Sequence, residues 1–227
     1  MEERKNKYKI KILEKGPYLV TGGVPLTEKI IAYDGEKYEW KEGRELPQSE
    51  TYTLCRCGKS KNHPFCDGNH VNVRFKSEET ASREPYKERA KLIKGPKLDL
   101  LDDGRCAFVR FCHRKDGDAW ELVEQSDNEE CRQEAIIAAS DCSAGRLTAV
   151  DKEGNLIEPE LEPGIEIVQD PARKVSACIN VKGYIPIESS DGHVYEIRNR
   201  VALCRCGKSK IKPFCDGMHV LTEFKDK

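Results

Sequence analysis

The chain has 227 residues, of which 35% are charged and only 37% hydrophobic, so little apolar area per residue is available for a core. Such a composition favours small domains with added stabilisation, which eleven cysteines could supply by binding metal. The net charge of −1 excludes a global basic field and so argues against nucleic acid or anionic lipid as partners.

The N-terminus carries charges but no apolar segment, and the longest aliphatic run covers only residues 135–139. These features exclude a secretion signal and a membrane-spanning helix. We therefore expect a cytoplasmic protein without membrane contact, whose cysteines stay reduced and free for metal or redox chemistry.

The first elements predicted along the chain are strands. Tyr8, Ile10 and Ile12 alternate with polar residues, and residues 194–203 show a similar alternation. The segments VTGGVPL, residues 20–26, and VKGYIPI, residues 181–187, also correspond to each other. Two similar, mainly β units are therefore predicted at the two ends of the chain.

A 16-residue motif lies in each unit, as CRCGKSKNHPFCDGNH at residues 55–70 and as CRCGKSKIKPFCDGMH at residues 204–219. Side chains two residues apart in an extended segment leave on the same side, so Cys55 and Cys57 can bind one metal. If a helix begins at Asp67, Cys66 and His70 also face the same way, one turn apart. The motif therefore predicts a metal centre in each unit.

The sequence also allows predictions for the residues around these ligands. The apolar alternation over residues 71–75 and 220–224 predicts a strand after each motif. His63 stands where the other copy has Lys212, and both this histidine and the basic cluster around Arg56 and Arg205 are expected to be solvated. Three cysteines and one histidine could also bind zinc, although zinc sites generally use cysteines separated by two to four residues. A zinc-stabilised interaction module therefore remains an alternative.

Both motifs resemble the CDGSH iron-sulfur domain of the NEET family. The family's Ser or Thr position is Ser60 or Ser209 here, whereas its small residue before the histidine is replaced by Asn69 or Met218. The resemblance implies one 2Fe-2S cluster per motif, with two cysteines on one iron and a cysteine and an exposed histidine on the other. Strand exchange in the family's homodimers further implies an internal pseudo-dimer and a monomeric chain. The ligands implied are Cys55, Cys57, Cys66 and His70, and Cys204, Cys206, Cys215 and His219.

The middle of the chain resembles a divergent single-cluster ferredoxin-like domain. It contains CAFVRFC at residues 106–112, a predicted helix at residues 128–140 with a capping box at Ser126 and Glu129, and then Cys142. In that family a non-ligand at the central cysteine position favours a 3Fe-4S cluster, and Val109 occupies this position here. Ser143 also replaces the usual proline. The ligands implied are Cys106, Cys112 and Cys142.

Two cysteines remain outside these sets. Cys131 lies eleven residues before Cys142, about 16 Å away along an unbroken helix, and is expected to pack in the core. Cys178 belongs to the predicted strand VSACINV and is also expected to be a core thiol.

The expected fold class is α+β, with two small mainly β CDGSH units, residues 1–76 and 174–227, around a ferredoxin-like middle domain, residues 77–173. No nucleophile, general base or substrate pocket is evident from the sequence, so we do not expect an enzyme. The expected function is electron transfer to or from a redox partner protein, with two 2Fe-2S clusters and one 3Fe-4S cluster. Iron-sulfur cluster transfer and redox sensing are the alternatives within the same chemistry.

Overall fold

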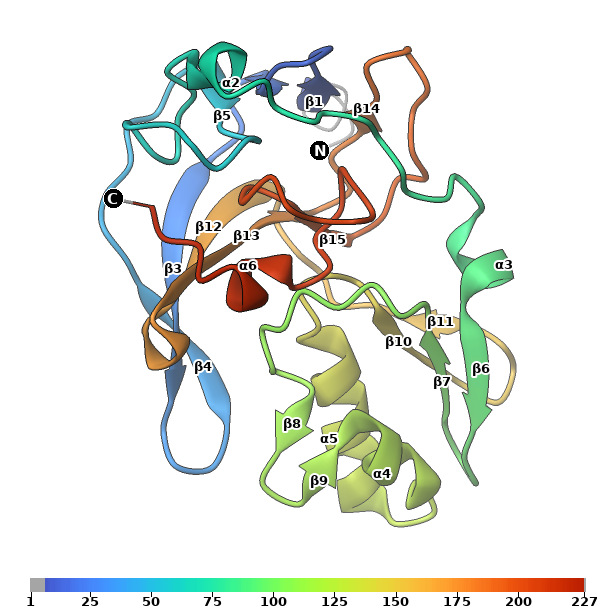
Figure 1. The fold of residues 1–227 in the computed structure, drawn as a ribbon. Helices are drawn as coiled ribbons and strands as arrows, with labels where there is room; N and C mark the ends of the chain where they lie inside the picture. The colour runs from blue at the N-terminus through green and yellow to red at the C-terminus, as the bar shows by residue number, and fades with distance from the viewer. Residues whose placement is uncertain (1–6, 227) are drawn as a thin grey trace.

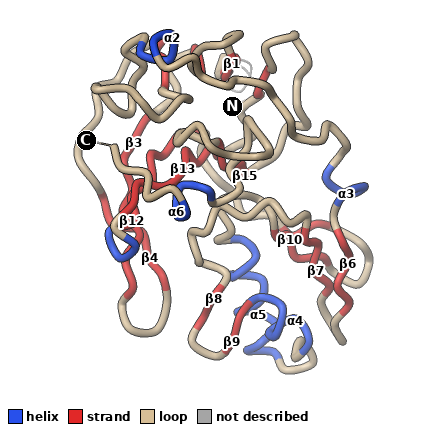
Figure 2. Tube along the Cα trace, in the orientation of Figure 1, coloured by secondary structure: helices blue, strands red, loops and turns tan. Residues whose placement is uncertain are grey.

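The computed structural model describes residues 7–226 and has an α+β fold of small sheets with few helices. Figure 1 shows the two ends of the chain folded together in one half of the molecule, while the helices α4 (Ala119–Glu124) and α5 (Glu129–Ser140) and a separate sheet form the other half. Figure 2 shows how much of the chain between these elements is loop. No helix in the described range is long and apolar enough to cross a membrane.

The first sheet combines strands from both ends of the chain. Three antiparallel strands come from the N-terminal unit, and a short strand of the C-terminal unit adds to β1 in parallel, with Ile10 opposite Ile187. The order is β14-β1-β2-β5, with bounds Ile187–Glu188, Lys9–Ile12, Tyr18–Thr21 and Thr51–Leu54.

The second sheet mirrors this arrangement. Three antiparallel strands come from the second half of the chain, and β3 of the N-terminal unit adds to β12 in parallel, with Leu26 opposite Ile165. The order is β15-β13-β12-β3-β4, with bounds Arg200–Leu203, Val175–Lys182, Gly164–Asp170, Leu26–Tyr33 and Tyr38–Glu42.

The two units therefore exchange strands, which confirms the internal pseudo-dimer. The C-terminal unit adds β14 to the first sheet and the N-terminal unit adds the hairpin β3–β4 to the second, so an edge that a single unit would expose is paired within the chain. A shared core of aliphatic and aromatic side chains from both units lies between the sheets. Because β12 begins at Gly164, this arrangement includes residues that the sequence analysis assigned to the middle segment.

The middle segment has its own antiparallel sheet and core. Leucine and alanine side chains of the sheet pack against α4 and α5, and the hairpin of β8 and β9 precedes α4. The sheet order is β11-β10-β7-β6, with bounds Leu156–Ile157, Leu147–Val150, Asp99–Asp102 and Lys91–Lys94. The other elements are α3 (Tyr86–Arg89), β8 (His113–Arg114), β9 (Gly117–Asp118), α4 (Ala119–Glu124), α5 (Glu129–Ser140) and the 3-10 helix η1 (Pro171–Arg173).

The predicted middle helix is confirmed as α5, but its cap is not the one expected. The side chain of Asn128 accepts the first free backbone N–H groups of the helix. Ser126 is fully buried instead, and its hydroxyl accepts the backbone N–H groups of Lys97 and Leu98. The half-buried Cys131 packs against the core of this segment.

The strands predicted after the two motifs are wrong. Both segments form one-turn helices, α2 (Asn69–Asn72) and α6 (Met218–Leu221). Val71 and Val73 alternate with polar residues in the sequence but do not face a core, since 71% and 43% of their surfaces are exposed. Of the alternating residues before the second motif, only Arg200–Leu203 form a strand, β15.

Candidate metal centres

Each motif brings its first two cysteines close together. The sulfurs of Cys55 and Cys57 lie 3.7 Å apart, and those of Cys204 and Cys206 lie 3.6 Å apart. Two thiolates bound tetrahedrally to one metal at about 2.3 Å are about 3.8 Å apart. The spacing therefore suits two ligands on one iron.

The third cysteine and the histidine form a second pair. The Sγ of Cys66 lies 3.4 Å from Nδ1 of His70, and the Sγ of Cys215 lies 3.5 Å from Nδ1 of His219. A sulfur and an imidazole nitrogen on one tetrahedral metal are about 3.6 Å apart. The helix does not start at Asp67 as expected, because Gly68 is the N-cap, but the two ligands still face each other.

Two separate pairs are what a two-iron cluster requires. The backbone N–H of Cys66 donates to the carbonyl of Thr53 at 3.0 Å, and that of Cys55 donates to the carbonyl of Pro64 at 2.8 Å, so the two pairs of the first motif are neighbours. Among residues 7–226, no group of three Cys, His, Asp or Glu side chains converges as a single metal ion would require. The donor set and its arrangement therefore fit a 2Fe-2S cluster in each motif.

Identical residues build the same loop in both copies. The Ser60 hydroxyl donates to a backbone carbonyl at 2.7 Å, and the Asp67 carboxylate accepts the backbone N–H of Lys61 at 2.8 Å. Ser209 and Asp216 make the corresponding bonds in the second copy. The backbone N–H of the CDG glycine points at the preceding thiol in each motif, which favours the thiolate form.

The arginine between the paired cysteines is buried in both copies, which corrects the expectation of a solvated face. Arg56 is 2% exposed and donates to the carbonyl of Gly16 at 2.9 Å. Arg205 is 1% exposed, donates to the carbonyls of Ala177 and Val168, and pairs with Asp226. These bonds tie the first CxC loop to the turn between β1 and β2, and the second to strands β12 and β13.

His63 is buried as well and packs edge-on against the ring of Phe224, with the centroids 5.7 Å apart. The sequence suggested a solvated side chain because a lysine stands at the corresponding position. Phe224 belongs to the C-terminal unit, so this contact forms between the units and leaves no local signal in the sequence.

The two CxC loops touch through their backbones. A Cβ on Gly58 would lie 2.5 Å from the carbonyl oxygen of Cys206, and one on Gly207 would lie 2.5 Å from that of Cys57. Both glycines have positive φ angles, so no other residue suits either position. Tyr18 adds to this contact by donating from its hydroxyl to the carbonyl of Cys204 at 2.8 Å. The two candidate cluster sites are therefore adjacent.

The two sites differ in their exposure. Cys66 and His70 are partly exposed, whereas Cys215 is 3% and His219 1% exposed. Burial, and then the charge of Arg205, lower the pKa of His219 to about 4. The neutral imidazole that binds iron is thereby favoured. The family resemblance implied an exposed histidine in both motifs, and this is wrong for His219.

The three cysteines predicted for the middle site line one small cavity together with Val109. Burial, and then the neighbouring thiols of Cys142 and Cys106, raise the pKa of Cys112 to about 12. The loop has positive φ angles at Phe108 and Arg110, and the backbone N–H of Phe108 points at the Sγ of Cys106 at 3.4 Å. Cys131 does not line this cavity.

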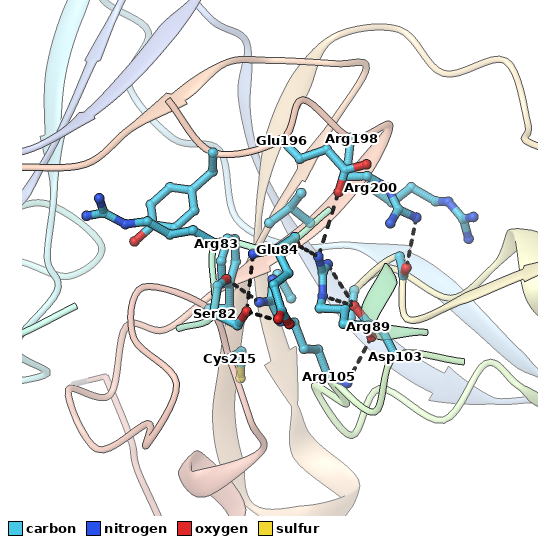
Figure 3. A pocket seen from close by; sticks show the side chains of 16 residues that line it. Ser82, Arg83, Glu84, Arg89, Asp103, Arg105, Glu196, Arg198, Arg200 and Cys215 are labelled. Carbon is cyan, nitrogen blue, oxygen red and sulfur yellow. Dashed lines mark hydrogen bonds and ion pairs between the residues drawn. The ribbon is translucent and has the colours of Figure 1, made fainter. Parts of the chain in front are cut away.

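An arginine-rich pocket borders the C-terminal site where the middle segment meets the C-terminal unit (Figure 3). Arg105 stacks on Phe214 with its guanidinium carbon 4.4 Å from the ring centre, and Cys215 is one of the residues that line the pocket. Burial, and then the charge of Arg89, lower the pKa of Arg105 to about 10. In the described part of the chain no acidic side chain forms an ion pair with Arg105.

Comparison with known proteins agrees with this geometry. The family described as "Iron-binding zinc finger CDGSH type" matches residues 15–71 and 177–220. The chain is 46% identical over 43 residues to "CDGSH iron-sulfur domain-containing protein 3, mitochondrial" of Mus musculus, and 44% identical over 43 residues to the protein of the same name from Homo sapiens. These matches cover 16% of this chain and 31% and 34% of the two relatives, so the chain spans about a third of their length. No solved structure matches the chain.

A chain with these two matches and two such sites is an iron-sulfur protein by class. More particularly, it carries two regions of CDGSH type, one on each side of a middle segment that the family model does not match.

Proposed function

We propose that the protein is a three-cluster electron carrier. The observation that carries this proposal is the arrangement of each CDGSH donor set as two pairs, with Sγ···Sγ distances of 3.7 and 3.6 Å and Sγ···Nδ1 distances of 3.4 and 3.5 Å. Bound clusters would supply one-electron redox chemistry. The residues proposed to hold the two 2Fe-2S clusters are Cys55, Cys57, Cys66 and His70, and Cys204, Cys206, Cys215 and His219.

The third cluster is proposed for the cavity of the middle segment. Cys106, Cys112 and Cys142 supply three thiols around one space, and Val109, which is 6% exposed, stands where a fourth ligand would be. Three thiolates suit a 3Fe-4S cluster in a ferredoxin-like domain.

A carrier role, rather than an enzymatic one, is proposed together with a redox protein as partner. We also propose a monomer in the cytoplasm. The parallel pairings of β14 with β1 and of β3 with β12 support the monomer. A homodimer would form such pairings by exchanging strands between two copies, whereas here they form within one chain.

Metal and sulfide analysis of anaerobically purified protein tests the proposal. Seven irons per chain are expected, together with an oxidised-state paramagnetic signal from the middle site. Cys142→Ala should abolish that signal and Cys131→Ala should preserve it. Four irons would remove the middle cluster from the proposal, and a colourless protein with stoichiometric zinc would support the interaction module instead.

Iron-sulfur cluster transfer is a second candidate because of one observation. The Cys66 and His70 pair is only partly buried, so this edge of the N-terminal site is open to an acceptor. Loss of visible absorbance with stoichiometric gain of a cluster by an apo-ferredoxin would favour transfer over electron carriage.

A further inference from the structure

The same glycine of the CDG sequence has different surroundings in the two motifs. A Cβ built on Gly68 meets no atom of the described residues within 4 Å. A Cβ built on Gly217 would lie 2.2 Å from the ring of Phe108. The backbone is alike at both positions, with φ angles of 83° and 79°. The difference therefore comes from Phe108, which lies over the second motif alone.

Phe108 belongs to the loop of residues 106–112 in the middle segment. Ala107, Val109 and Phe111 of this loop share a core cluster with Cys215 and with residues of the second sheet. On another side, the backbone of Gly207 contacts the CxC loop of the N-terminal unit. The C-terminal site therefore lies between the N-terminal site and the middle site.

The loop is held in place by two contacts. Arg110 donates two hydrogen bonds, at 2.6 and 3.0 Å, to the fully buried carboxylate of Asp170 at the end of β12. Phe111 stacks on Trp40 of β4 with the ring centres 4.4 Å apart. A bidentate buried ion pair and a stacked aromatic pair are both directional, so the loop is a fixed part of the fold.

We propose that residues 106–112 form a permanent cover over the C-terminal CDGSH site. The two CDGSH sites then have different tasks: the N-terminal site exchanges with other molecules, and the C-terminal site communicates only with the sites on either side of it in the same chain. This inference rests on the proposed function in so far as both sites hold clusters.

Chelation of iron at neutral pH measures the cover directly. In protein loaded with clusters, a small iron chelator should remove the two irons of the N-terminal site quickly and those of the C-terminal site slowly. The middle site is followed separately by its paramagnetic signal. Phe108→Ala should accelerate the slow phase and leave the fast phase unchanged. Because 45% of the Phe108 surface is exposed, this variant is expected to fold.

Two further variants serve as controls. Tyr33→Ala removes an aromatic side chain that is 58% exposed at the last residue of β3. The rates of both phases of iron release should equal those of the unchanged protein. Phe108→Trp keeps an aromatic cover and should keep the slow phase. Equal release from the two sites in the unchanged protein, or a slow phase unaffected by Phe108→Ala, would overturn the inference. Protein that binds no iron would instead refute the proposed function.

Discussion

Replacing Arg110 with alanine removes the buried ion pair with Asp170 that holds the loop of residues 106–112 against β12. The Arg110 side chain is 10% exposed and its partner Asp170 is 0% exposed. After the replacement, the remaining partners of the carboxylate are the backbone N–H of Arg173 at 3.4 Å and the Arg173 guanidinium at 3.9 Å. A buried negative charge would then be incompletely compensated.

Breaking a buried ion pair by removing one partner costs about 3–5 kcal/mol. Because Arg173 compensates part of the charge, we expect a loss near the lower end, about 3 kcal/mol. For a protein of this size, each kcal/mol lowers the melting temperature by about 2–4 °C. The expected decrease is therefore about 6–12 °C.

Lys115→Ala is the matched control, since it removes an exposed ion pair that the same segment makes with Glu36 of the N-terminal unit. Lys115 and Glu36 lie 2.7 Å apart but are 62% and 64% exposed. An exposed pair contributes at most about 1 kcal/mol. Thermal unfolding of both variants at equal iron content, followed by circular dichroism, gives the comparison. A decrease for Arg110→Ala no larger than that for Lys115→Ala would refute the reasoning, and adding Asp170→Asn to Arg110→Ala should recover part of the loss.

Three other predictions follow from the sites. Gly207→Ala should lower the free energy of unfolding in urea more than Gly192→Ala. Both glycines have positive φ angles, but of the two only Gly207 would place a Cβ 2.5 Å from a carbonyl oxygen of the described chain. Arg105→Gln should lower the midpoint potential of one 2Fe-2S cluster in a redox titration, because a nearby cation stabilises the added electron; unchanged potentials would contradict the charge argument. At pH 5 the visible absorbance should decay in two phases. Burial lowers the pKa of His219 to about 4, so this ligand stays neutral until the pH falls to about that value, and the C-terminal cluster should decay slowly. The partly exposed N-terminal cluster should be lost first. A single phase would show that burial does not protect the second cluster.

The features that the sequence determined by itself are local ones. The spacing of Cys55 and Cys57 and of Cys66 and His70 was enough to predict two pairs of ligands, since neighbours in an extended segment or a single turn have few relative positions. The helix over residues 128–140 was predictable for the same reason. The pseudo-dimer was implied by the resemblance to homodimers that exchange strands, and the correspondence of residues 20–26 with residues 181–187 agrees with it.

Burial around the motifs could not be predicted in this way. Arg56 and His63 have the residue types of a solvated surface, yet the fold encloses them with carbonyls and a ring from other parts of the chain. The alternation of apolar and polar residues at Val71 and Val73 led to the wrong prediction of a strand, because a pattern of period two indicates a strand only where a core covers one face.

The difference between the two cluster sites was decided by the tertiary structure alone. The motifs are nearly identical, so local chemistry gives both the same ligand types and the same hydrogen bond from the CDG glycine to the thiol. Phe108 and Gly217 are far apart in sequence and meet because the Arg110–Asp170 pair and the stacking of Phe111 on Trp40 fix the middle loop against β12 and β4. Solvent access depends on such long-range contacts, and it distinguishes two sites that their sequences make alike.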